Sequence, residues 1–177
     1  MKIITGMHRS GTSLVAKIFY KAGADMGDDQ FYRADKWNPD GYFEKTEFHA
    51  VNMPLINGPF GKLAYFSLPS TKTILRRSKR FSREIENISE KYKGKIVKET
   101  RNCLTLPAWL KYGCSVEKII ICLRDPIHVA YSLKKRNHAM LIHSYRLWYE
   151  HNIRILQHAK NIPNWFVYYH TLVQNKF

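Results

Sequence analysis

Short apolar runs alternate with longer amphipathic stretches along this chain. The runs at residues 2–5, 95–98 and 118–123 are rich in β-branched residues and are predicted as strands, the third of them buried on both faces. Residues 164–169 are predicted as a last strand. The amphipathic stretches predict helices at residues 12 to about 23, 44–57, 72–92, 104–112, 126 to about 136, and about 139–160.

This order of elements predicts an α/β fold with three layers, in which helices cover both faces of a central parallel sheet. In such a sheet, ligands bind beyond the C-terminal ends of the strands. The chain has 177 residues and is 45% hydrophobic, which is enough to bury one core. A single domain over residues 1–177 is therefore expected, with a polar and aromatic loop at 24–41.

Positive charge is in large excess, with 29 Lys and Arg against 14 Asp and Glu, a formal net charge of +15. This excess favours an anionic partner, and on charge alone nucleic acid, a membrane surface, a nucleotide and an acidic polymer all remain open. No apolar stretch approaches the length of a membrane span, and the N-terminal run is too short for a signal peptide. A cytoplasmic protein is expected.

The first predicted strand leads into Gly6-Met7-His8-Arg9-Ser10-Gly11-Thr12-Ser13, which has the G-x-x-x-x-G spacing of a phosphate-binding loop. Thr12 stands where a Walker A loop carries its lysine, and the cation of the loop is Arg9. Backbone N–H groups and a helix N-terminus would still face an anion. A glycine turn without a ligand is the plainer interpretation, but the hydroxyls and Arg9 favour an anion site.

A second basic position follows the buried strand at 118–123. It is Arg124, in Arg124-Asp125-Pro126, and Ser132 lies eight residues beyond it on the next predicted helix. An arginine at the C-terminal end of a buried strand suggests a second anion. The alternatives are that Arg124 pairs with Asp125 or caps a helix.

Together these features resemble the PAPS-dependent sulfotransferases, whose R/K-S-G-T-T/S loop holds the 5′-phosphosulfate of 3′-phosphoadenylyl sulfate (PAPS). In that family an arginine, with a serine eight positions later, holds the 3′-phosphate. Residues 9–13 match the first element, and Arg124 with Ser132 matches the second. Residues 38–44, 97–101, 148–156 and 167–172 also resemble the bacterial branch. Family members usually continue past the last strand with a helix and a loop that helps hold the nucleotide, whereas this sequence stops at Phe177. The domain is therefore expected to be short at its C-terminal end.

The resemblance implies a sulfotransferase with a P-loop nucleotide-hydrolase-like fold. It would move a sulfuryl group from PAPS to a hydroxyl or amine by in-line displacement, leave PAP as product, and require no metal. Arg9 would neutralise charge on the bridging oxygen. Arg136, one turn after Ser132, would add a contact to the 3′-phosphate. The remaining donor-binding residues it implies are Ser10, Gly11, Thr12, Ser13, Arg124 and Ser132.

The family removes the acceptor's proton with a histidine or a glutamate, depending on the branch. Glu44 is the first choice here, because it follows the phosphate loop where glutamate-using branches place their base. Glu99, at the end of the strand at 95–98, is second, and His8 and His49 are third. The plainer interpretations are that Glu44 begins a helix and that Glu99 pairs with a neighbouring cation.

Six cations lie within residues 72–83, and this basic run suggests either a solvated helix face or an acidic acceptor such as an acidic saccharide. Aromatic side chains in the loops at 31–43 and 60–66 are candidates for the acceptor pocket, although core packing explains most of them equally well. No nucleic-acid partner is expected.

Two alternatives to a sulfotransferase remain open. One is a P-loop kinase-like nucleotide-binding enzyme, which would want a lysine at position 12 and a magnesium carboxylate, for which Asp125 is the best-placed residue. The other is a polyanion-binding module without catalysis, whose affinity would survive loss of Arg9 and Arg124.

Overall fold

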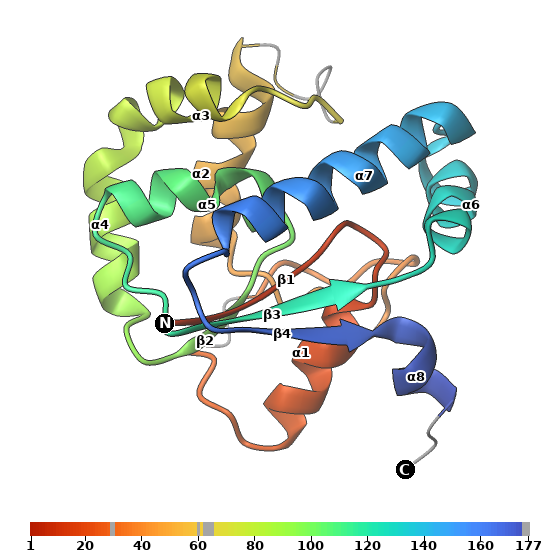
Figure 1. Ribbon diagram of the computed structural model, residues 1–177. Helices are drawn as coiled ribbons and strands as arrows, with labels where there is room; N and C mark the ends of the chain where they lie inside the picture. The colour runs from red at the N-terminus through yellow and green to blue at the C-terminus, as the bar shows by residue number, and fades with distance from the viewer. Residues whose placement is uncertain (29–30, 60, 62–65, 175–177) are drawn as a thin grey trace.

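The computed structural model describes residues 1–28, 31–59, 61 and 66–174, with a four-stranded parallel sheet at its centre (Figure 1). The strands are β1 (Lys2–Thr5), β2 (Ile96–Lys98), β3 (Lys118–Leu123) and β4 (Asn164–Tyr168), arranged in the order β2-β1-β3-β4. All pairs are parallel, with Lys2 opposite both Ile96 and Lys118. The predicted strands are confirmed, with ends that differ by at most one residue.

The two faces of the sheet follow the alternation of side chains along each strand. Ile3, Ile119 and Ile121 belong to the larger hydrophobic cluster, on one face. Ile4, Ile120 and Cys122 alternate with them and belong to a second cluster, on the other face. Because β1 and β3 are buried on both faces, their sequences are almost continuously apolar.

Helices cover both faces of the sheet (Figure 1), which confirms the predicted three-layer α/β fold. Helix α1 (Thr12–Lys21) packs on the face that carries the second cluster, the one with Ile4 and Ile120. Across the sheet, the larger cluster draws residues from α2 (Thr46–Asn57), α3 (Thr71–Ser78), α4 (Ser82–Lys91), α5 (Asn102–Lys111) and α7 (Leu141–His158). Helix α6 (Pro126–Asn137) packs on α7 through Val129, Leu133 and Leu147.

Two segments differ from the prediction. The helix predicted at 72–92 is divided by a 3-10 turn, η2 (Lys79–Phe81), into α3 and α4. The guanidinium of Arg77 donates to the backbone carbonyls of Leu55 and Ile56, at the end of α2, and so ties the last turn of α3 to its neighbour. The short helix α8 (Tyr169–Gln174) follows β4 without a break and was not predicted, since six residues are too few for a periodic pattern.

All four strands point the same way, so the residues that follow them meet at one edge of the sheet. Gly6 follows β1, Glu99 follows β2, Arg124 follows β3 and Tyr169 follows β4. This edge carries the site described below. Within the ranges described above, no helix is both long and apolar enough to cross a lipid bilayer.

Candidate anion-binding site

The loop between β1 and α1 has the shape expected of a phosphate cradle. Arg9 and Gly11 both have positive φ, at 70° and 87°, and Gly11 is the N-cap of α1. The loop thus turns sharply and places the N-terminus of α1, where backbone N–H groups lack intrahelical partners, at the C-terminal edge of the sheet. Ser10 is buried, and its hydroxyl has no hydrogen-bond partner among the described residues.

The two basic constellations of the sequence meet at this loop. The Nε of Arg9 donates to the hydroxyl of Ser132 at 2.8 Å, and Nη1 of Arg124 donates to the backbone carbonyl of Arg9 at 3.0 Å. Residues more than 110 positions apart therefore form one cationic surface. The remaining N–H groups of both guanidinium ions leave donors for a ligand.

Arg124 is held from the other side by a residue that sequence reasoning missed. Its guanidinium lies 4.3 Å from the ring centroid of Tyr169, the first residue of α8. The Nε of Arg124 is buried and makes no hydrogen bond within the described part of the chain. Tyr169 directly follows the last strand, and that position at the ligand-binding edge was the signal that could have identified it.

A third arginine closes this end of the site. Nη2 of Arg136 donates to the hydroxyl of Tyr42 at 2.6 Å and to Oδ2 of Asp35 at 3.3 Å, and the Tyr42 hydroxyl donates to Asp35 at 2.8 Å. Burial, and then the charges of Arg136 and Arg124, lower the pKa of Arg9. Like charges this close favour an anion between them.

The convergent residues line a cavity of about 600 Å³, a volume typical of sites for small organic ligands. Of the predicted site residues, those that line it are Arg9, Gly11, Thr12, Ser13, Glu44 and Arg124. Arg136, His8 and His49 line it as well. Ser10, Ser132 and Glu99 are not among the described lining residues, although Ser132 reaches it through Arg9.

The aromatic residues predicted for an acceptor pocket are partly found here. Tyr32, Trp37, Tyr42 and Phe66 line the cavity. Residues 60 and 62–65 of the second predicted loop lie outside the described residues.

Comparisons with known proteins find only distant structural likenesses. No family model and no curated protein matches the chain. Among solved structures, it is similar to deoxyadenosine kinase from M. mycoides with bound dATP, with a TM-score of 0.48 and 15% identity over 99% of this chain and 98% of that one. The same kinase with bound dCTP gives a TM-score of 0.47 and 16% identity over the same shares. We draw no functional inference from a likeness of this extent.

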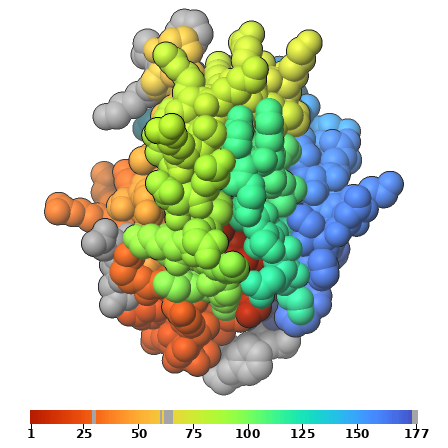
Figure 2. Space-filling model, turned by 90° about the vertical axis from the view of Figure 1, so that its left-hand side faces the viewer, coloured from red at the N-terminus to blue at the C-terminus, as the bar shows by residue number. Residues whose placement is uncertain are grey.

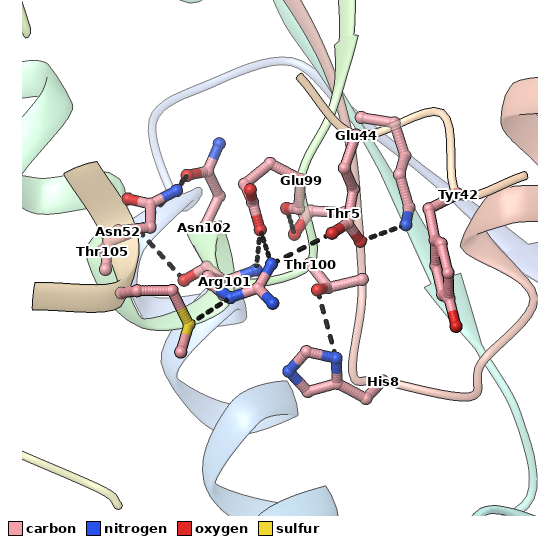
Figure 3. A network of polar contacts seen from close by, with 12 residues as sticks. Thr5, His8, Tyr42, Glu44, Asn52, Glu99, Thr100, Arg101, Asn102 and Thr105 are labelled. Carbon is pink, nitrogen blue, oxygen red and sulfur yellow. Dashed lines mark hydrogen bonds and ion pairs between the residues drawn. The ribbon is translucent and has the colours of Figure 1, made fainter. Parts of the chain in front are cut away.

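The inner end of the cavity is a buried network of four charged side chains (Figure 3). The carboxylate of Glu44 binds Lys98 through Oε1 and Nη1 of Arg101 through Oε2, the latter at 3.1 Å. Arg101 also donates to Oε1 of Glu99 at 2.8 Å. Burial by itself would raise the pKa of Glu44, but the charges of Lys98 and Arg101 outweigh it and hold that pKa well below its usual range. Glu44 is therefore an ionised carboxylate that faces the cavity.

Glu99 is the member of this network that does not line the cavity. It is fully buried, burial and the nearby Glu44 raise its pKa, and its Oε2 has no partner among the described residues. Because its bonds run to Arg101, its contribution to the cavity is to hold that side chain in place.

The two histidines named as third candidates for the base lie beside the network. Burial, and then the charge of Arg101, lower the pKa of both, that of His49 to about 4. Both are therefore neutral at pH 7. His8 contacts the hydroxyl of Thr100 at 3.3 Å.

Two other predicted features lie away from the cavity. Asp125 is exposed and caps α6, its Oδ1 accepting from the backbone N–H of Ile127 at 2.8 Å. The basic run at 72–83 belongs to α3, η2 and the start of α4, which Figure 2 shows as a yellow-green band across one face. None of its residues lines the cavity in the described structure.

Proposed function

We propose that this protein is a sulfotransferase that moves a sulfuryl group from PAPS to a hydroxyl or amine. One observation carries the proposal: Arg9, Arg124 and Ser132, chosen from the sequence as binders of two ends of one donor, lie in direct contact at the phosphate loop. A ligand with anionic groups on one small scaffold is what three convergent arginines and a helix N-terminus would hold.

The donor fits the unsatisfied polar groups of the site. The buried Ser10 hydroxyl and the Nε of Arg124 both lack partners among the described residues, and each can donate to a phosphate oxygen. The 5′-phosphosulfate would lie on the loop and the N-terminus of α1, and Arg124 and Ser132 would hold the 3′-phosphate. Arg136 would join them, exchanging Asp35 for the phosphate.

In the reaction, the acceptor oxygen or nitrogen forms a bond to sulfur while the bond from sulfur to the bridging phosphate oxygen breaks. The electron pair of the broken bond stays on PAP, where Arg9 would offset the growing charge. The acceptor's proton would pass to the carboxylate of Glu44. Negative charges of the bound donor counteract Lys98 and Arg101, and so raise the pKa of Glu44 toward a value useful for a base.

The same residues disfavour the kinase alternative. Position 12 is a buried threonine rather than the Walker lysine, and Asp125, the residue best placed by sequence to bind magnesium, is occupied as a helix cap outside the cavity.

The deciding experiment is equilibrium binding of PAP by calorimetry, set against ATP with and without Mg²⁺. We expect PAP to bind without Mg²⁺, and Arg124→Ala to weaken it roughly 10- to 100-fold, since one charge-assisted contact contributes about 1.5–3 kcal/mol. Arg146→Ala, which removes an exposed arginine of α7, is the matched control and should leave the affinity unchanged. Tight Mg²⁺-dependent ATP binding with no affinity for PAP would favour the kinase.

A further inference from the structure

The cavity has a second wall that the donor does not explain. Three rings form a row along it: Tyr42 packs edge-on against Tyr32 at 5.9 Å, and Tyr32 stacks on His49 at 4.9 Å with 28° between their planes. The row runs from Arg136, which binds the Tyr42 hydroxyl, toward Arg101, whose charge acts on His49. It therefore joins the anion end of the cavity to the network that contains Glu44.

The same part of the cavity is lined by Met53 and Phe66. Met53 accepts a hydrogen bond from Nε of Arg101 through its sulfur, at 3.2 Å, so its side chain lies over the buried network. Tyr32 is 43% exposed, which leaves ring surface for a ligand. Aromatic rings and a thioether are surfaces that suit a flat, weakly polar molecule.

The charges of the described lining residues are all accounted for without an acidic acceptor. Arg9, Arg124 and Arg136 belong to the anion end, while Lys98 and Arg101 are ion-paired with Glu44. No residue of the basic run at 72–83 is among the described lining residues, and its Arg77 is bound to the end of α2. Every cation among the described lining residues thus has another role, and none is left to bind the acidic saccharide that the sequence suggested.

His49 supplies the polar contact that an acceptor needs. Its Nδ1 is buried and has no hydrogen-bond partner among the described residues, although the ring lines the cavity. An unsatisfied nitrogen of this kind is costly unless a ligand pairs with it. A hydroxyl or amine held there would lie beside Glu44, which also acts on His49.

We propose that the acceptor is a small uncharged molecule whose hydroxyl or amine is carried on a planar ring, and that this ring lies against Tyr32 with its polar group at His49. The inference rests on the proposed sulfotransferase function and narrows its acceptor class. Tyr32 is then the residue that determines specificity.

The test is calorimetric titration of 2-naphthol into the protein saturated with PAP, with an unsaturated heparin disaccharide as the acidic probe. PAP is titrated first, so that failure of the donor site is seen separately from failure of the acceptor site. We expect 2-naphthol to bind, and Tyr32→Ala to weaken it about 3- to 10-fold, the range of an aromatic contact. Tyr32→Phe keeps the ring and should bind as the parent protein does.

Three results would overturn the inference. They are no binding of 2-naphthol to the PAP-loaded protein, binding that Tyr32→Ala leaves unchanged, and preferential binding of the disaccharide that Lys79→Ala in the basic run abolishes. Absence of PAP binding in the first titration would instead remove the sulfotransferase proposal, and the acceptor class with it.

Discussion

The contact between Gly11 and Tyr169 ties the phosphate loop to the end of the last strand. It can be tested by Gly11→Ala, which adds one methyl group. Gly11 has a φ of 87°, and a Cβ added to it would lie 2.4 Å from Cδ2 of Tyr169. The left-handed backbone costs a non-glycine residue about 1–2 kcal/mol, and an extra methyl in a packed contact costs about 1–3 kcal/mol. We expect Gly11→Ala to lower the free energy of unfolding by about 2–5 kcal/mol.

Gly94→Ala is the matched control. Gly94 also has a positive φ, of 75°, but a Cβ there would meet nothing within 4 Å. It should cost only the backbone contribution, about 1–2 kcal/mol. Urea denaturation of both variants measures the difference, which isolates the contact with the tyrosine ring.

The double variant Gly11→Ala with Tyr169→Ala, together with the two single variants, completes a double-mutant cycle. Removing the ring should recover most of the excess cost, so the two substitutions should be strongly non-additive. Because Arg124 lies on the same ring, Gly11→Ala should also weaken PAP binding, while Gly94→Ala should not. Equal costs for the two glycine variants, within about 0.5 kcal/mol, would refute the packing of Tyr169 on the loop.

Two further predictions concern proton binding. Glu44→Gln should abolish turnover, because an amide cannot accept the acceptor's proton, while PAP affinity by calorimetry stays nearly unchanged; retained turnover would exclude Glu44 as the base. His151 is fully buried, its Nδ1 faces the carbonyl of Leu147 at 2.8 Å, and burial lowers its pKa to about 4. Since the unfolded chain binds a proton near pH 6.5 that folded His151 does not, stability should rise with pH between about 4 and 6.5, by up to about 3 kcal/mol. His151→Gln should reduce the slope of the urea-derived stability profile over that range and leave the part that His8 and His49 contribute. An unchanged profile would contradict this assignment.

Much of the fold could be predicted because its signals are local. The β-branched runs of β1 and β3 need no tertiary information to be recognised, and neither does the glycine spacing of the loop between β1 and α1. The meeting of Arg9 with Arg124 followed from a general rule, since parallel strands deliver their C-terminal ends to one edge. The break between α3 and α4 was not predicted, because the charged and apolar residues of 72–92 continue across it without a local stop signal.

For the candidate base, Glu44, one part could be predicted from the sequence and another part depends on the tertiary structure. The position of Glu44 after the phosphate loop suggested a proton acceptor, but nothing in the sequence indicated that Lys98 and Arg101 would bind its two oxygens. These partners lie more than 50 positions away, and a parallel bridge between Glu44 and Lys98, outside the named strand pairs, brings them together. The low pKa of Glu44 in the free protein therefore depends on the tertiary structure.

By itself the sequence determined the order of the four strands and of most helices, the glycine spacing of the loop after the first strand, and the arginine that follows the third strand, because each is encoded in a few consecutive residues. The tertiary structure alone decided which cations face the cavity, which are neutralised by Glu44, and that an aromatic row rather than the basic run lines its second wall. The reason is physical: burial and pairing set the effective charge of a side chain, and both depend on residues that are distant along the chain.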